Sequence, residues 1–208
     1  MENEKQVFEY RGIENLVVAR ILKDSKQELT FDTPRKLAGV KKITKSVQTS
    51  SEPKFCDNKP KFMVTAIGND DFAIDATALD DEEKAYILGS NYDPETGILL
   101  EGSEEPPYCA IGYIFKDTRG IERFVIRYKG MFGFPSDEYN TEDNSTNTTG
   151  NSLVYTGIYP EHEFETDDGK KSFKGYILNT NVKKVDKETF FSKITLHTEI
   201  KSNAVTTG

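Results

Sequence analysis

Apolar and polar residues alternate most clearly between residues 108 and 134, where two apolar runs flank a polar turn at residues 116–120. In the second run, apolar and basic residues occupy alternating positions. The even-numbered positions include Phe124, Ile126 and Tyr128, and the odd-numbered positions include Arg123, Arg127 and Lys129. Side chains of a strand point to alternate faces, so this pattern predicts a strand with one solvated face. Together the two runs predict a β-hairpin long enough to form the centre of a sheet.

Shorter apolar runs predict further strands on both sides of this hairpin. They cover residues 16–22, 29–31, 40–49, 62–67, 72–78, 98–100, 152–158 and 195–200. Residues 161–165 and 172–178 predict another hairpin across Asp168-Gly169, because Asp-Gly is a strong two-residue turn signal. Strand 40–49 has no clean apolar face, which suits an edge strand or a strand completed by another subunit.

The segment between strands 40–49 and 62–67 predicts a long exposed loop over residues 50–61. It contains two prolines and mostly polar residues, with Phe55 as its single aromatic side chain. Ordering such a loop without contacts costs conformational entropy. We therefore expect the loop to be functional, at an interface.

Two short helices are predicted from their capping residues. Asp80 is followed three residues later by Glu83, as in a capping box, and Gly89 fits the C-terminal end of a helix over residues 80–88. Capping and the helix dipole explain the acidic residues 80–83, so no metal site is needed there. Asp186 predicts the start of a second helix that ends near Lys193. The pattern as a whole predicts a mainly β fold.

The composition fits one folded domain with polar ends. The chain has 208 residues and is 36% hydrophobic, below the roughly 45–50% of an average globular protein. Its 13 Phe and 10 Tyr are nevertheless sufficient for a core. We expect a single domain over residues 1–208, with polar arms at about residues 1–9 and 201–208.

The charge and the apolar runs exclude several classes of partner. A net charge of −8 disfavours tight binding of nucleic acid, which needs clustered basic residues. The charged residues 1–5 do not form a signal peptide, and no apolar run approaches the ~20 residues that span a bilayer. We expect a protein made in the cytoplasm, with no membrane partner.

No catalytic or metal-binding pattern stands out among the reactive residues. His162 lies between two glutamates beside a turn, His197 lies in a predicted strand, and neither accompanies a Ser or Cys motif. Cys56 and Cys109 are too far apart in sequence to indicate a zinc motif or a disulfide framework. Residues 136–150 alternate Asp and Asn like a calcium loop but lack the Gly and closing Glu of that motif. We expect no enzyme activity, cofactor or metal.

Four segments, in their order along the chain, resemble the major tail protein of phages with long non-contractile tails that infect Gram-positive hosts. Residues 10–19 contain a glycine followed by a predicted strand, and residues 32–39 contain a Thr-Pro…Gly turn. Residues 87–100 comprise the end of a predicted helix, a glycine, an acidic turn and a strand, and the proline-rich residues 106–113 lead into the central hairpin. Residues 151–200 follow more loosely, with Phe190-Phe191 in the expected helix. The order of the segments carries the resemblance.

This resemblance implies a β-sandwich or barrel-like tail tube fold with a flanking short helix and extended loops. It implies a virion structural protein whose hexameric rings stack into a tube, a conduit for DNA ejection into the host. The implied partners are other copies of the chain and the tape measure, distal tail and terminator proteins. DNA would pass through without specific binding.

The resemblance also suggests which residues contact other subunits or the lumen. Strands 40–49 and 62–67 are the candidates for the lumen wall. The inter-ring loop would comprise Ser50, Ser51, Glu52, Pro53, Lys54, Phe55, Cys56, Asp57 and Asn58. Asp70, Asp71 and Asp75 would face the lumen and repel phosphates within a Debye length of ~8 Å. Strand 40–49, a candidate for the lumen wall, carries the basic residues Lys41, Lys42 and Lys45, which argue against a uniformly acidic wall.

Two other classes of function remain open from the sequence. One is another β-sandwich component of the tail or baseplate, or a host-surface binding module, present in low copy number. The other is an enzyme whose activity would depend on His162 or His197.

Overall fold

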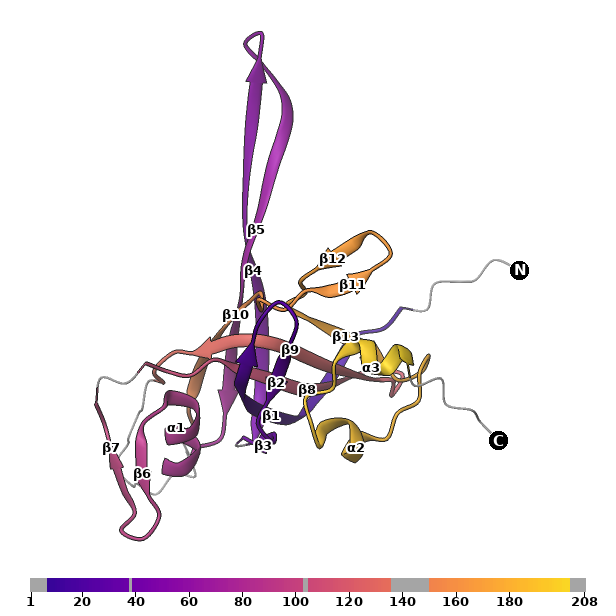
Figure 1. Cartoon of the computed structure of the whole chain (residues 1–208). Helices are drawn as coiled ribbons and strands as arrows, with labels where there is room; N and C mark the ends of the chain where they lie inside the picture. Colours follow the sequence, from indigo (N-terminus) through magenta and orange to yellow (C-terminus); the bar gives the residue numbers. More distant parts are fainter. Residues whose placement is uncertain (1–6, 38, 103–104, 136–149, 203–208) are drawn as a thin grey trace, which may run out of the picture.

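The computed structural model describes residues 7–37, 39–102, 105–135 and 150–202, and these residues form a mainly β fold. One nine-stranded antiparallel sheet dominates, in the order β2-β1-β8-β9-β10-β5-β4, with β3 paired to β1 and β13 paired to β9 (Figure 1). Its strands are β1 (Tyr10–Asp24), β2 (Leu29–Phe31), β3 (Arg35–Lys36), β4 (Val40–Cys56), β5 (Lys59–Ala76), β8 (Cys109–Asp117), β9 (Glu122–Phe132), β10 (Ser152–Ile158) and β13 (Gly175–Asn179).

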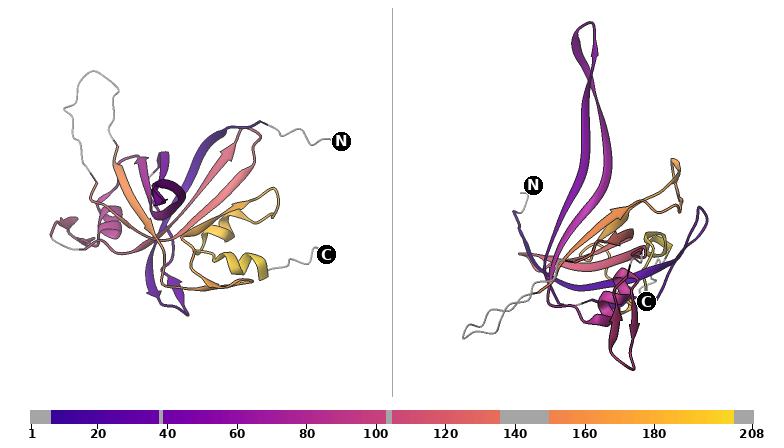
Figure 2. Two further views of the ribbon diagram at one scale, coloured as in Figure 1. Left: turned by 90° about the horizontal axis from the view of Figure 1, so that it is seen from above. Right: turned by 90° about the vertical axis from the view of Figure 1, so that its left-hand side faces the viewer.

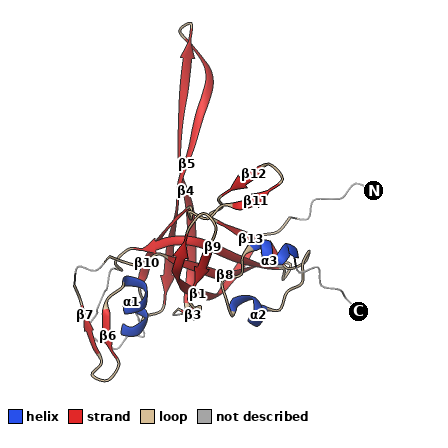
Figure 3. Ribbon diagram, in the orientation of Figure 1, coloured by secondary structure: helices blue, strands red, loops and turns tan. Residues whose placement is uncertain are grey.

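The remaining elements lie at the periphery of this sheet. Two small hairpins are β6 (Asn91–Asp93) with β7 (Ile98–Leu100), and β11 (Phe164–Thr166) with β12 (Gly169–Lys171). The helices are α1 (Asp81–Leu88), α2 (Lys187–Phe191) and α3 (His197–Ser202), drawn in blue in Figure 3. The structure confirms the central β8–β9 hairpin and the two predicted helices, α1 and α2. It also confirms the other predicted strands, apart from the differences described below.

The sheet curves into a barrel-like body with a core on its inner face. β4 comes back into contact with β1, although the described residues of these two strands form no ladder. The inner core draws on β1, β5, β8, β9, β10 and α1, with Leu16, Val18, Phe72, Ile74, Ile111, Tyr113, Val125, Leu153, Tyr155 and Ile87 among its members. Burial of each such large side chain stabilises the fold by about 1.5–3 kcal/mol.

A second core lies on the outer face of β1, β8 and β9, beneath α2 and α3. Phe124 of β9 packs against Phe190 and Phe191, with ring centroids 5.0 and 5.2 Å apart. The sheet therefore buries both faces in this region. The outer face of β4, β5 and β10 has no such cover: the outward side chains Asp75, Ser152 and Val154 are exposed.

The predicted solvated face of β9 is wrong. Val125 and Arg127 alternate onto the face of β9 expected to contact solvent. Both are buried, because the curved sheet encloses that face. A β-bulge lies between Arg127 and Gly130, and the extra residue reverses the inward and outward positions after it. Gly130 is required here: a Cβ atom at this position would lie 2.3 Å from Cζ of Tyr155.

The predicted loop over residues 50–61 is also wrong. β4 and β5 pair through this region to a two-residue turn at Asp57 and Asn58, whose φ angles of 51° and 62° suit a tight hairpin turn. The predicted strand 62–67 and residues 72–76 of the predicted strand 72–78 are both part of the single strand β5, which ends at Ala76. Pro53 is tolerated because it lies on the edge strand of the sheet, where a missing N–H need not break a ladder. The resulting hairpin rises far from the body in Figures 1 and 2.

Two further predictions in the C-terminal third need correction. Residues 197–202 form α3, not a strand, and Leu196 and Ile200 both pack on the outer core. The turn at Asp168 is confirmed, but its hairpin is only the short β11–β12 pair, and β13 pairs with β9 instead. Most of both predicted arms, and residues 136–149 of the calcium-like segment, lie outside the described residues.

Candidate interaction surface

The most unusual surface of the molecule is the outer part of the β4–β5 hairpin, residues 47–69, here called the projecting hairpin. Every residue in it is exposed. It nevertheless carries large apolar side chains that are 41–65% exposed: Val47, Phe55, Phe62, Met63, Val64 and Ile67. Exposed apolar side chains gathered on one element are typical of a contact surface.

Both faces of the projecting hairpin carry these apolar residues. Directly opposed residues of an antiparallel pair share a face. Pro53 lies opposite Met63, and Lys54 lies opposite Phe62 on the other face. Each face therefore combines apolar side chains of β5 with mostly polar side chains of β4. Because an isolated two-stranded hairpin is only marginally stable in water, this arrangement fits an element that partners cover from both sides.

The edges of the projecting hairpin are also available for pairing. β4 is the last strand of the sheet, and β10 pairs with β5 only from Asp70 to Asp75. Among the described residues, residues 59–69 of β5 and the outer edge of β4 therefore have no ladder partner on one side. Rows of unpaired N–H and C=O groups are a template for adding strands from another chain.

Buried ion pairs hold the hairpin at its base. Asp70 is 4% exposed and accepts hydrogen bonds from Lys45 Nζ and Lys174 Nζ, both at 2.8 Å. Burial raises the pKa of Asp70, but the hydrogen bonds from the two lysines outweigh it and the net pKa is lowered. Lys174 also donates to the backbone oxygen of Gly68. Asp70, expected to face a lumen, is thus committed to the chain's own lysines.

The other two acids of that prediction lie together on the outer face of β5. Asp71 accepts hydrogen bonds from Gln48 Nε2 at 2.8 Å and from Thr156 Oγ1 at 3.3 Å. Asp75 is exposed and lies opposite Lys42 of β4. This outer face is polar and has charges of both signs.

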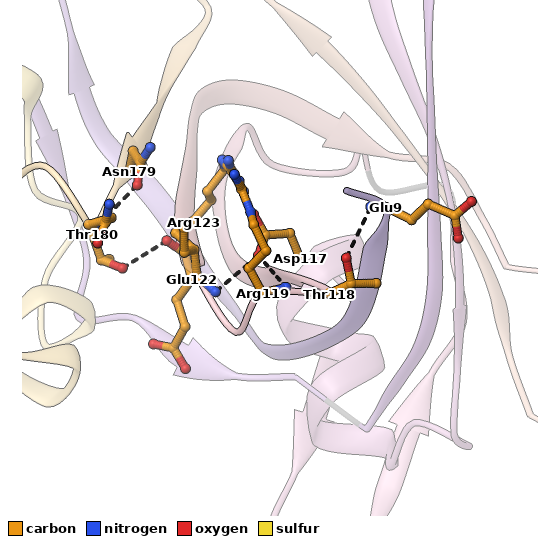
Figure 4. A network of polar contacts seen from close by, with 10 residues as sticks. Glu9, Asp117, Thr118, Arg119, Glu122, Arg123, Asn179 and Thr180 are labelled. Carbon is orange, nitrogen blue, oxygen red and sulfur yellow. Dashed lines mark hydrogen bonds and ion pairs between the residues drawn. The ribbon is translucent and has the colours of Figure 1, made fainter. Parts of the chain in front are cut away.

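A second buried carboxylate, Asp117, organises the turn between β8 and β9 (Figure 4). It accepts hydrogen bonds from Arg119 Nη2 at 2.5 Å and Arg123 Nη1 at 3.2 Å, and from the backbone N–H groups of Arg119 and Ile121. The hydrogen bond from the Arg119 side chain is the main reason why the pKa of Asp117 lies well below its ordinary value.

The same turn anchors the N-terminal segment. The N–H of Thr118 donates to the oxygen of Glu9 at 2.9 Å, and the N–H of Glu9 donates to Thr118 Oγ1 at 3.3 Å (Figure 4). The guanidinium of Arg119 lies 4.0 Å from the ring centroid of Phe8. These contacts set the direction in which the chain enters the sheet.

The histidines lie in aromatic surroundings. His162 and His197 each lie 4.5 Å from the ring centroid of Phe164, and His197 Nδ1 is 2.9 Å from the hydroxyl of Tyr128. Within the described ranges, no group of three or more His, Cys, Asp or Glu side chains is arranged to hold a metal ion. None of the described helices has the length and apolar character needed to cross a membrane.

The cysteines differ sharply in accessibility. Cys56 is exposed beside the hairpin turn, and Cys109 is buried in β8, where burial raises the pKa of its thiol to about 12.

Sequence reasoning missed two contributors to this surface. The apolar run Phe62-Met63-Val64 lies in a predicted lumen strand, but its place in a hairpin that projects from the body is not evident from the sequence, because residues 50–61 resemble a loop. The contribution of Lys174 is not predictable from the sequence, because it lies 104 residues from Asp70 and no local pattern connects them.

No protein-family model matches the chain, and a search of curated proteins returns no significant match.

Proposed function

We propose that this chain is a self-assembling virion structural protein, the subunit of a phage tail tube. In this proposal, hexameric rings of the chain stack into a tube through which DNA passes into the host. The chain is made in the host cytoplasm and resides in the virion. The observation that carries the proposal is the projecting hairpin, which is exposed on both faces and along both edges.

The physical argument starts from the cost of leaving this hairpin exposed. Covering its apolar side chains gains on the order of 1 kcal/mol for each half-exposed residue. Pairing its edges with strands of neighbouring copies removes free N–H and C=O groups that otherwise favour aggregation. A sheet continued from subunit to subunit can close into a barrel, which has no edges left.

The body offers a complementary feature, the open seam between β1 and β4. A pocket of about 840 Å³ lies along it, lined by Tyr10, Ile13, Lys42 and Phe115 among others. Contacts between different surfaces of identical subunits are heterologous, and such contacts extend into rings or filaments. A hairpin that leaves one subunit and a seam that receives a neighbour support this type of assembly.

The lumen wall is proposed on the uncovered outer face of β4, β5 and β10. Asp71 and Asp75 remain its acidic candidates, and Asp70 is withdrawn because it is buried between lysines. Lys42 opposite Asp75 reduces the local negative charge. Repulsion of DNA would therefore be weak and of short range.

The two cysteines provide a direct test. A maleimide should label Cys56 but not Cys109 in the dilute chain, because only Cys56 is exposed. In assembled particles purified for electron microscopy, labelling of Cys56 should slow strongly, and rings or tubes should be visible. Unfolding in denaturant, which exposes Cys109, is the positive control for the reagent.

Two results would overturn the proposal. One is equal labelling of Cys56 in the dilute and assembled states, because the hairpin tip would then lie outside every interface. The other is a copy number of a few chains per particle, which would favour a baseplate component or a host-binding module.

A further inference from the structure

A second pocket lies at the base of the projecting hairpin, between β4, β5 and the segment that leads into β13. It is open to solvent and has a volume of about 620 Å³. Its charged lining consists of Lys45, Asp70, Arg127, Lys171 and Lys174. Asp70 is the one acid among its lining residues, so the pocket has an excess of positive charge.

The ion pairs of the lining residues leave Arg127 uncompensated. Asp70 is shared between Lys45 and Lys174, and Lys171 pairs with Asp168 outside the pocket. None of the described residues forms an ion pair with Arg127. Its guanidinium lies 5.7 Å from the ring centroid of Phe72, a contact that satisfies no N–H group.

Arg127 is buried in a way that is costly without a ligand. The residue is 9% exposed, and its Nε is buried with no hydrogen-bond partner. A buried charge without a partner is strongly unfavourable.

We propose that this pocket binds a single oxyanion, a carboxylate or a phosphate group, on Arg127, Lys45 and Lys174. The planar fork of N–H groups on a guanidinium matches two oxygens of such a group. The two ammonium groups are already positioned 2.8 Å from Asp70 and add positive charge beside the fork. Tyr113 lines the adjoining seam together with Arg127.

Two sources can supply this oxyanion. One is free inorganic phosphate, which requires no other protein. The other is an acidic side chain from a second copy of this chain, which has 35 Asp and Glu residues; this source rests on the proposed assembly. Val47 and Ile67 of the projecting hairpin also line the pocket, so a neighbour that covers the hairpin would reach it.

The test follows the Nε–Hε signal of Arg127 by nuclear magnetic resonance in the ¹⁵N-labelled full chain. The signal is assigned by its loss in Arg127→Lys. Sodium phosphate is titrated into the dilute wild-type chain against sodium chloride of equal ionic strength. A saturable shift of this signal with phosphate alone is expected. Lys45→Gln should weaken phosphate binding roughly tenfold, because it removes one charge-assisted hydrogen bond.

Lys42→Gln is the matched control, since it removes a lysine from the same strand that does not line this pocket. It should leave phosphate binding unchanged. The proposal is overturned if phosphate and chloride shift the signal equally, or if both lysine variants weaken binding to the same extent.

A further arm identifies the source. In phosphate-free buffer, a shift of the signal with protein concentration that phosphate reverses identifies the carboxylate of a second copy. A signal that is independent of protein concentration but saturates with phosphate identifies a free oxyanion. Because the titration uses the dilute chain, it gives its answer whether or not tubes form.

Discussion

The strands β4 and β5 belong to two regions of the molecule that differ in almost every physical property. At their base they complete the barrel-like body, and beyond Val47 and Asn69 they leave it as the projecting hairpin. Phe72 and Phe62 illustrate the contrast, because they lie on the same strand and are 0% and 56% exposed. The difference arises from what lies around each part. The base is flanked by β10 and the inner core, whereas the hairpin pairs with no further described strand and contacts the body only near Val47, Ile67 and Gly68.

The residue pattern of β5 changes at the same boundary. In the body, Phe72 and Ile74 point inward while Asp71 and Asp75 point outward, as expected for a strand with one buried face. In the projecting hairpin, apolar residues occur at both parities. The body therefore satisfies its own core, and the hairpin does not. Stability and assembly should consequently be separable by mutation, with the body controlling unfolding and the hairpin controlling association.

The largest expected effect comes from truncating one phenylalanine in each region. Phe72→Ala leaves a cavity in the inner core and should lower the free energy of unfolding by about 3–5 kcal/mol. Phe62→Ala should change it by no more than ~0.5 kcal/mol in the dilute chain, because the side chain is largely in water already. Chemical denaturation monitored by circular dichroism measures both values.

The same pair should behave in the opposite way in assembly. Phe62→Ala should reduce ring or tube formation in a chain that remains folded, measured by sedimentation. A loss of stability in Phe62→Ala comparable to that in Phe72→Ala would show that the hairpin packs on the body, and the two-region comparison would fail.

Two glycines give the next largest contrast. At Gly130 an added Cβ would lie 2.3 Å from Cζ of Tyr155 and 2.5 Å from the oxygen of Thr156, so Gly130→Ala should cost about 1–3 kcal/mol through overpacking. At Gly68, in the hairpin, an added Cβ would lie 3.3 Å from Cβ and 3.4 Å from the backbone oxygen of Gln48, contacts that a shift of a few tenths of an ångström relieves. Gly68→Ala should stay within ~0.5 kcal/mol of the wild type. Thermal unfolding that ranks the two variants in the reverse order would contradict the crowding at Gly130.

The body was largely predictable from the sequence because its signals are local. The alternation around Phe124, the turn at Gly120 and the capping box of Asp80 with Glu83 all act within a few residues. The elements themselves are confirmed: both strands of the central hairpin form, and Asp80 accepts a hydrogen bond from the N–H of Glu83. The solvated face predicted for β9 is not, because the curvature of the sheet buries it.

The hairpin and the C-terminal helix were not predictable from local patterns. Prolines and polar residues are typical of loops, but Pro53 lies on the edge strand of the sheet, a position in which sheets accommodate proline. Leu196 and Ile200 are four residues apart, a spacing that fits one face of a strand and one face of a helix equally well. The helix forms because Leu196 and Ile200 pack on the outer core, and that core is assembled from segments that are distant in sequence.

Acid sensitivity should be a property of the body. The pKa of Asp117 is lowered in the folded chain, so its contribution to stability is present above the unfolded value of about 4 and is lost as the pH falls below it. Asp117→Asn should therefore destabilise the protein at pH 7 and flatten the decline in stability below about pH 4. Denaturation curves collected across this range test the sign. A variant with the acid profile of the wild type would mean that the contacts with Arg119 and Arg123 do not stabilise the fold.

The smallest expected effect on stability comes from removing an exposed ion pair of the projecting hairpin. Glu52 and Lys54 form an ion pair at 2.9 Å on the projecting hairpin, with side chains 68% and 48% exposed. Exposed pairs of this kind contribute little, since water and salt screen them. Glu52→Gln should change the free energy of unfolding of the dilute chain by less than ~0.5 kcal/mol. An effect above 1 kcal/mol that also depends on protein concentration would mean that the pair is already buried against a second copy under the conditions used. The hairpin would then contribute to stability through assembly, and its apparent independence from the body would hold only for the isolated subunit.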